Sequence, residues 1–114
     1  MTETPTVGDY MTRDVATVSP DDTVGDVTER IVESDSHDGY PVCETRRVDG
    51  FVSARDLLNA DDGARIFTVM TEDIIVAHPD MEVTDAARVI LRSGIQQLPV
   101  VNDANNLVGI ISNS

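Results

Sequence analysis

Lysine and tryptophan are absent from the 114-residue sequence, and cysteine occurs once, as Cys43. A single cysteine excludes an internal disulfide and a cysteine-based zinc site, and we predict that Cys43 is a small buried strand residue. Aromatic residues make up only 4% of the chain, so the core must be built from Val, Ile, Leu and Ala. No apolar run approaches the roughly 20 residues needed to span a bilayer, and residues 1–6 lack the features of a signal peptide. We therefore expect a cytoplasmic protein.

Basic residues are also scarce, since eight arginines stand against 21 acids and give a net charge of −13. Such a surface repels nucleic acid and anionic lipid, so we expect neither nucleic acid nor membrane as a partner. The acids are spread among periodic apolar segments rather than gathered in one disordered block. An acid excess without lysine is typical of a salt-rich cytoplasm, where ions screen the repulsion. We expect a halophilic host.

Signatures of catalysis are missing as well. The two histidines, His37 and His78, do not have metal-ligand spacing, and no local pattern places a base beside Cys43. Isolated glycines form neither a P-loop nor a dinucleotide fingerprint. We predict that the protein is not an enzyme, has no catalytic or metal site, and requires no cofactor.

The sequence does contain an internal duplication. A shift of 59 residues superimposes matching residues of the two halves: Met11-Thr12 on Met70-Thr71, Asp14 on Asp73, Pro20-Asp21 on Pro79-Asp80, Ser34 on Ser93, Gly50 on Gly109 and Ser53 on Ser112. A shift of 58 superimposes Pro41-Val42 on Pro99-Val100, so the first copy has one extra residue near 35–37. We predict a first repeat over 7–60, a linker over 61–65 and a second repeat over 66–114.

Each copy predicts the same order of elements, β-α-β-β-α, and hence an α/β fold. The expected segments are short strands at 15–18 and 74–77, helices with apolar stripes at 24–31 and 83–91, and hairpin strands at 40–43, 48–52, 98–101 and 107–111. Gly94 is expected to end the second helix, whose stripe is predicted to be core or repeat interface. Ser53 is expected to cap a final helix through Leu58. The second repeat stops at Ser114 without that helix, so we expect the natural chain to continue.

Three paired motifs resemble a known family. They are YMTRDVATVSPDDTV with VMTEDIIVAHPDMEV, GYPV with QLPVV, and GFVSARDLL with GIIS. In order and in register, they resemble a tandem cystathionine-β-synthase (CBS) domain pair, or Bateman module, over residues 7–114. The resemblance implies two repeats packed with pseudo-twofold symmetry, with clefts between them. It also implies a regulatory module that binds AMP, ADP, ATP or S-adenosylmethionine.

The family motif suggests which residues bind such a ligand. Gly50 would let the ligand approach the backbone, Ser53 would face a phosphate with Arg55 beside it, and Asp56 would accept both ribose hydroxyls. The resemblance implies further residues around these: Asp38, Gly39 and Tyr40 as a flanking loop, and His78 from the other repeat. For a second site it implies Gly109 and Ser112, together with Thr17, Ser19, Gln96 and Gln97.

Two alternatives remain open from the residues alone. Ser53 and Asp56 also favour a helix start without any ligand, and His78 before a proline is also typical of a solvated turn. The chain is therefore either a nucleotide-sensing module or a ligand-free dimerisation module. Because the apolar strand expected at 107–111 lacks a covering helix, we expect a homodimer.

The charge predicts a dependence on salt. We expect the thermal unfolding midpoint to rise from low to molar salt, because ions screen the repulsion among the acids. Circular dichroism across a salt series measures this, and a midpoint that stays constant would contradict the prediction.

Overall fold

The computed structural model describes residues 4–33 and 39–112, and the chain divides into two compact units. One unit comprises residues 16–74 and is called the β1–β2 unit below. The other comprises residues 1–15 and 75–114 and is called the β3–β4 unit. The N-terminal segment therefore belongs to the unit formed mainly by the second half of the chain. The predicted division at 61–65 follows the sequence duplication, whereas these units follow spatial contact.

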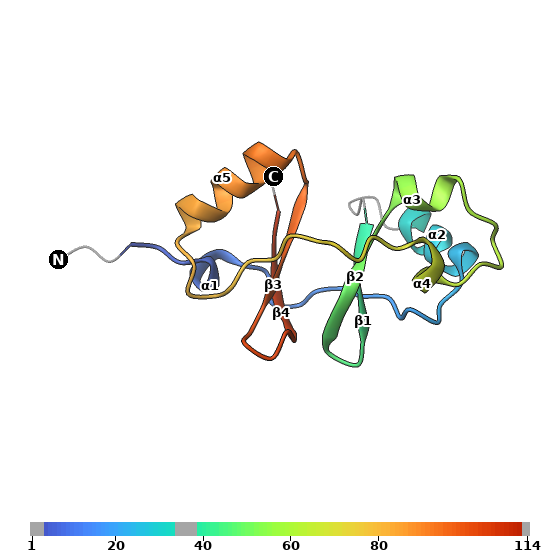
Figure 1. Ribbon diagram of the computed structural model, residues 1–114, viewed down its shortest axis with the longest axis horizontal. Coiled ribbons are helices and arrows are strands. Elements are labelled where there is room, and N and C mark those ends of the chain that lie inside the picture. The colour runs from blue at the N-terminus through green and yellow to red at the C-terminus, as the bar shows by residue number, and fades with distance from the viewer. Residues whose placement is uncertain (1–3, 34–38, 113–114) are drawn as a thin grey trace. The chain divides into compact units, whose positions relative to one another are not determined.

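The β1–β2 unit consists of an antiparallel hairpin and three helices (Figure 1). Its elements are α2 (Val24–Glu33), β1 (Gly39–Glu44), β2 (Arg47–Ser53), α3 (Ala54–Leu58) and α4 (Ile66–Val69). β1 and β2 are hydrogen-bonded neighbours, and α3 contacts both α2 and β2. The predicted hairpin and the helix after Ser53 are confirmed.

The β3–β4 unit repeats this plan with a second hairpin (Figure 1). Its elements are α1 (Val7–Tyr10), α5 (Val83–Ser93), β3 (Gln97–Val101) and β4 (Leu107–Ser112). α5 ends where predicted, because Gly94 adopts the left-handed conformation with φ 68° and donates its N–H to the carbonyl of Ile90. α1 and α4 were not predicted, since four residues are too short to show a helical period.

The short strands predicted at 15–18 and 74–77 are wrong in extent. Only Val18 and Ala77 form bridges, each parallel to the first strand of its hairpin. The flanking residues have other hydrogen-bond partners: the N–H of Ser19 donates to the Asp22 carboxylate, and the carbonyl of Thr17 accepts from Arg30. In the first copy, side chains thus take hydrogen bonds that a longer strand would use.

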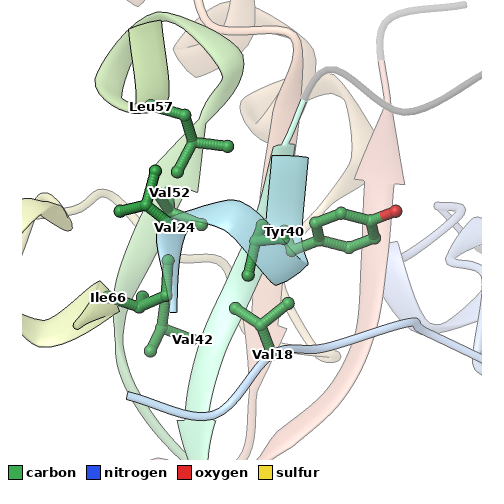
Figure 2. Close-up of a cluster of buried hydrophobic side chains, with 8 residues drawn as sticks. Val18, Val24, Tyr40, Val42, Val52, Leu57 and Ile66 are labelled. Atoms are coloured by element: carbon green, nitrogen blue, oxygen red, sulfur yellow. The ribbon is translucent and has the colours of Figure 1, made fainter. Parts of the chain in front are cut away.

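Each unit has its own aliphatic core. In the β1–β2 unit the buried residues are Val18, Val24, Val27, Tyr40, Val42, Val52, Leu57 and Ile66 (Figure 2). In the β3–β4 unit they are Val7, Ala77, Ala86, Ile90, Leu98 and Val100. The stripe predicted on α5 is only partly core, since Ala86 and Ile90 are buried but Leu91 is 76% exposed. Cys43 is a buried residue of β1, as predicted.

A Met-Thr segment pairs with the second strand of each hairpin. We use this name for Met70-Thr71, which pairs with β2, and for Met11-Thr12, which pairs with β4. Phe51 and Thr71 exchange two backbone hydrogen bonds of 2.8 and 2.9 Å, and Ile110 and Thr12 do the same. The segment from each sequence repeat therefore pairs with the hairpin of the other repeat. Because these segments lie so close to the hairpins, the positions just before the paired residues of β2 and β4 have no room for a side chain.

Gly50 and Gly109 occupy those positions. A Cβ at Gly50 would lie 2.6 Å from the carbonyl oxygen of Thr71, and one at Gly109 would lie 2.6 Å from Sδ of Met11. On this side of the strand the protein itself fills the space next to Gly50. The approach of a ligand to the Gly50 backbone stays a prediction. The glycines are explained by the Met-Thr segments.

Substitutions at these glycines test this explanation. Gly50→Ala and Gly109→Ala are each expected to lower the free energy of unfolding by about 1–3 kcal/mol, the usual cost of overpacking. The control is Gly63→Ala, because a Cβ there would meet nothing within 4 Å; its effect should stay within about 0.5 kcal/mol. Urea unfolding measures all three, and equal effects at the three positions would contradict the explanation.

Candidate functional site

Ser53 and Asp56 form a capping box where β2 passes into α3. The N–H of Ser53 donates to Oδ2 of Asp56 at 3.0 Å, and the N–H of Asp56 donates to Oγ of Ser53 at 3.3 Å. Both residues are half-buried. Among the described residues Oδ1 of Asp56 has no hydrogen-bond partner, and neither does the hydroxyl hydrogen of Ser53. The capping role is confirmed, and it leaves one carboxylate oxygen and one hydroxyl donor unused.

The first residues of β1 lie next to this capping box. Gly39 is paired with Ser53 and Tyr40 with Val52 in the antiparallel register. Tyr40 is 2% exposed and belongs to the core of the unit. The hairpin thus brings Gly39 and Ser53, which are far apart in the sequence, to one end of the sheet. Asp38, predicted beside them, lies outside the described residues.

Thr17 and Ser19 flank the parallel bridge between Val18 and Val42. Both are half-buried, and Oγ of Ser19 accepts a hydrogen bond from the N–H of Asp21 at 3.2 Å. The structure therefore places Thr17 and Ser19 in the same unit as Gly39, Tyr40, Ser53 and Asp56. Arg55 also belongs to this unit, where it is exposed on α3.

Sequence reasoning missed Arg30, which stands in the last turn of α2. Its Nη1 donates to the carbonyl oxygen of Thr17 at 3.0 Å, and its Cζ lies 4.7 Å from the ring centroid of Tyr40. Both partners are predicted site residues. No local motif could have revealed Arg30, because its contacts join three separate segments of the chain.

The β3–β4 unit holds the remaining predicted residues. Gln97 is paired with Ser112 in the hairpin, which repeats the pairing of Gly39 with Ser53. Oε1 of Gln97 is buried and has no hydrogen-bond partner among the described residues. Gln96 and His78 are exposed, the latter in the turn after Ala77. Gln97 and Ser112 are therefore brought together at the end of this hairpin.

Each unit contains a hollow that is lined only by its own residues among those described. The first, about 330 Å³ in the β1–β2 unit, is rimmed by carboxylates and contains no predicted site residue; it is lined by Pro20, Asp21, Glu44, Asp49, Phe67, Met70 and Glu72. The second is a groove of about 440 Å³ between α5 and β4, lined by Tyr10, Thr12, Val83, Ala87, Ile90, Leu91, Ile110, Ile111 and Ser112. We call it the α5–β4 groove. None of the described residues that line it is charged.

Cys43 is poorly suited to nucleophilic chemistry. Burial, and secondarily the charge of Asp49, raise the pKa of its thiol from 9.0 to about 11. The thiol therefore stays protonated at neutral pH, and a protonated thiol is a weak nucleophile. Residues 4–33 and 39–112 contain no group of three His, Cys, Asp or Glu side chains able to hold a metal ion. No described helix is long and apolar enough to cross a membrane.

Several known proteins are similar to this chain in sequence and in fold. The sequence matches the CBS domain family twice, over residues 7–63 and 66–114. An uncharacterized protein of Methanocaldococcus jannaschii, MJ0188, is 44% identical over 109 residues, which cover 94% of this chain and 41% of MJ0188. The chain thus spans less than half the length of that relative.

Two solved structures with bound nucleotides have the same fold. CBSX2 in complex with AMP has a TM-score of 0.88 and 32% identity, covering 96% of this chain and 90% of CBSX2. The cytosolic domain of the Mg²⁺ channel MgtE in complex with ATP has a TM-score of 0.86 and 26% identity, covering 95% of this chain and 46% of the other. The duplicated hairpins, their helices and these matches agree: the chain belongs to the CBS domain family and has the mixed α/β fold of a tandem CBS pair.

Proposed function

We propose that this chain is a non-catalytic regulatory module that binds an adenosine nucleotide, namely AMP, ADP, ATP or S-adenosylmethionine. The observation that supports this most is the capping box at the end of β2. It holds Ser53 and Asp56 beside Gly39 and leaves Oδ1 of Asp56 without a partner in the described part of the chain. CBSX2 and MgtE, which are similar to this chain, were solved with AMP and ATP.

Each polar residue would have a distinct role toward such a ligand. A carboxylate with one unused oxygen can accept hydrogen bonds from the vicinal hydroxyls of ribose, and these are strengthened by its charge. The hydroxyl of Ser53 would donate to a phosphate oxygen. Gly39 and Tyr40 would line the same binding region, with Arg55 at its edge. Thr17 and Ser19, which the resemblance assigns to the second site, belong to this same unit. In the β3–β4 unit, the buried Oε1 of Gln97 would accept from an amino group, with Gln96 and Ser112 in the same site; His78, which the resemblance assigns to the first site, also belongs to this unit.

The module would act by biasing a partner protein rather than by chemistry of its own. Its residues offer hydrogen bonds and charge, whereas the one thiol is buried and protonated. The charge of −13 fits a protein of a salt-rich cytoplasm in a halophile. We propose no nucleic acid and no membrane as partners, for the same electrostatic reason.

Asp56 provides the sharpest test of this function. Asp56→Asn is expected to weaken AMP binding about ten- to a hundredfold, because a charge-assisted hydrogen bond to ribose becomes a neutral one. Isothermal titration calorimetry measures the affinity, and thermal unfolding without ligand checks the fold.

The matched control for this test is Asp9→Asn. Asp9 shares one half of this box with Thr6, whose N–H donates to Oδ2 of Asp9 at 3.0 Å, the distance found at Ser53 and Asp56. The Thr6 hydroxyl also donates to Oδ2 of Asp9, at 3.2 Å. Asp9→Asn should therefore cost similar stability and leave AMP affinity unchanged. If Asp56→Asn binds AMP as wild type does, or if both variants lose affinity equally, Asp56 does not hold the ribose.

A second candidate function is assembly through the α5–β4 groove, with a second copy of this chain as the occupant. In the β1–β2 unit, α3 contacts α2 and buries Leu57 in a core that includes Val24. The groove contains Val83, which corresponds to Val24 under the shift of 59. Two copies that each carry a charge of −13 repel one another except where an uncharged surface meets an uncharged surface. The groove is such a surface.

Substitutions at Leu91, which lines the groove, and at Val32, which does not, distinguish assembly through this groove from a general effect of added charge. These residues correspond under the 59-residue shift and are 76% and 74% exposed. Leu91→Glu is expected to convert a homodimer to a monomer in light scattering at high salt, whereas Val32→Glu should leave the dimer intact. A monomeric wild type, or a Leu91→Glu variant that still dimerises, would contradict assembly through this groove.

A further inference from the structure

Arg30 is held beside the candidate site by two contacts from different segments. One N–H of its guanidinium donates to the backbone of Thr17 at 3.0 Å, and its plane lies over Tyr40 with Cζ 4.7 Å from the ring centroid. Figure 2 shows the Tyr40 ring extending away from the aliphatic cluster. The residue before it, Gly39, is paired with Ser53. The positive charge is thus held against Tyr40, the residue that follows the partner of Ser53 in the hairpin.

No carboxylate of the described chain neutralises this charge. Asp26 and Glu33 lie at helical spacing on α2, yet the one ion pair found in residues 4–33 and 39–112 joins Arg88 to Asp85. A guanidinium has five N–H donors in a planar fork, and the Thr17 carbonyl engages one of them. The other donors of Arg30 have no protein partner among the described residues. A guanidinium that is fixed and has no carboxylate partner in residues 4–33 and 39–112 suits an anion that can accept two parallel hydrogen bonds.

The other candidates for holding a phosphate in this unit are weaker. Arg55 is exposed and makes no contact that fixes its guanidinium in the described structure. α3 has only five residues, so its N-terminus offers little dipole. In the β3–β4 unit, the position that corresponds to Arg30 under the 59-residue shift is Val89. A fixed cation at this position is therefore a feature of the β1–β2 unit alone.

We propose that Arg30 binds the phosphate of the nucleotide, and that it makes the site select phosphorylated nucleotides over adenosine. This inference rests on the proposed function and adds the ligand class: a nucleoside phosphate. Thr17 and Tyr40 are positioning residues for the guanidinium. Any nucleotide bound here would place its phosphate near the C-terminal turn of α2.

Titration of two ligands tests this role directly. Arg30→Gln is expected to weaken AMP binding by at least about tenfold and to change adenosine binding by less than about threefold, since a charge-assisted contact is lost from the phosphate alone. Arg30→Lys keeps the charge without the planar fork, so it should fall between wild type and Arg30→Gln for AMP. Arg88→Gln on α5 is the control and should leave both affinities unchanged. Calorimetry should use the lowest salt in which the chain stays folded.

The outcomes that overturn the proposal are distinct from failure of the proposed function. If Arg30→Gln weakens AMP and adenosine equally, Arg30 is only a structural brace for Thr17 and Tyr40. If Arg30→Gln binds AMP as wild type does, Arg30 does not touch the phosphate. If Arg30→Gln does not fold, the same comparison is made with Arg30→Lys. A larger loss of affinity for AMP than for adenosine supports the proposal, and an equal loss overturns it. If wild type binds neither compound, this inference fails for AMP, and the proposed function is decided by titration with ADP, ATP and S-adenosylmethionine.

Discussion

The edge pairing between each hairpin and a Met-Thr segment is the constraint on which the rest of the structure depends. Thr71 pairs with Phe51 and Thr12 with Ile110, and Gly50 and Gly109 leave room for this approach. The segment that pairs also delivers a core residue: Ile66 precedes Thr71 and is fully buried in the β1–β2 unit, and Val7 does the same in the β3–β4 unit. Neither sequence repeat can therefore complete a sheet edge and a core by itself.

This exchange of segments between the two sequence repeats explains how a chain with so few aromatic residues and so much negative charge forms ordered units. Each core is small and aliphatic, but it receives residues from both halves of the sequence, which increases the apolar surface removed from water. The acids remain on the surface, since no charged residue is buried in the described structure. Ordered hairpins in turn fix the polar residues at their ends, and those ends carry the groups to which we assign ligand binding. The proposed function thus depends on the backbone register of the hairpins.

The sequence was sufficient to predict the hairpins, the long helices and the helix caps, because each has a local signal. Gly94 ends α5, and Ser53 caps α3 by accepting a hydrogen bond from the N–H of Asp56, three residues further on. The exchange of segments and the position of Arg30 could not be predicted, because both depend on contacts between parts of the chain without a shared motif. The close approach of Thr71 to Gly50 could not be predicted for the same reason. A motif shows that a glycine is required but does not show whether a ligand or another strand fills the space.

Binding of an adenosine nucleotide is the central claim, and thermal unfolding in molar salt with a panel of ligands tests it most directly. A ligand that binds only the folded chain stabilises it by about 2.7 kcal/mol at a hundred times its dissociation constant. We predict that the unfolding midpoint of the wild-type chain rises with at least one of AMP, ADP, ATP and S-adenosylmethionine, and that it does not rise with uridine monophosphate at the same concentration. A midpoint that none of the four adenosine compounds raises, or that uridine monophosphate raises equally, would contradict the account.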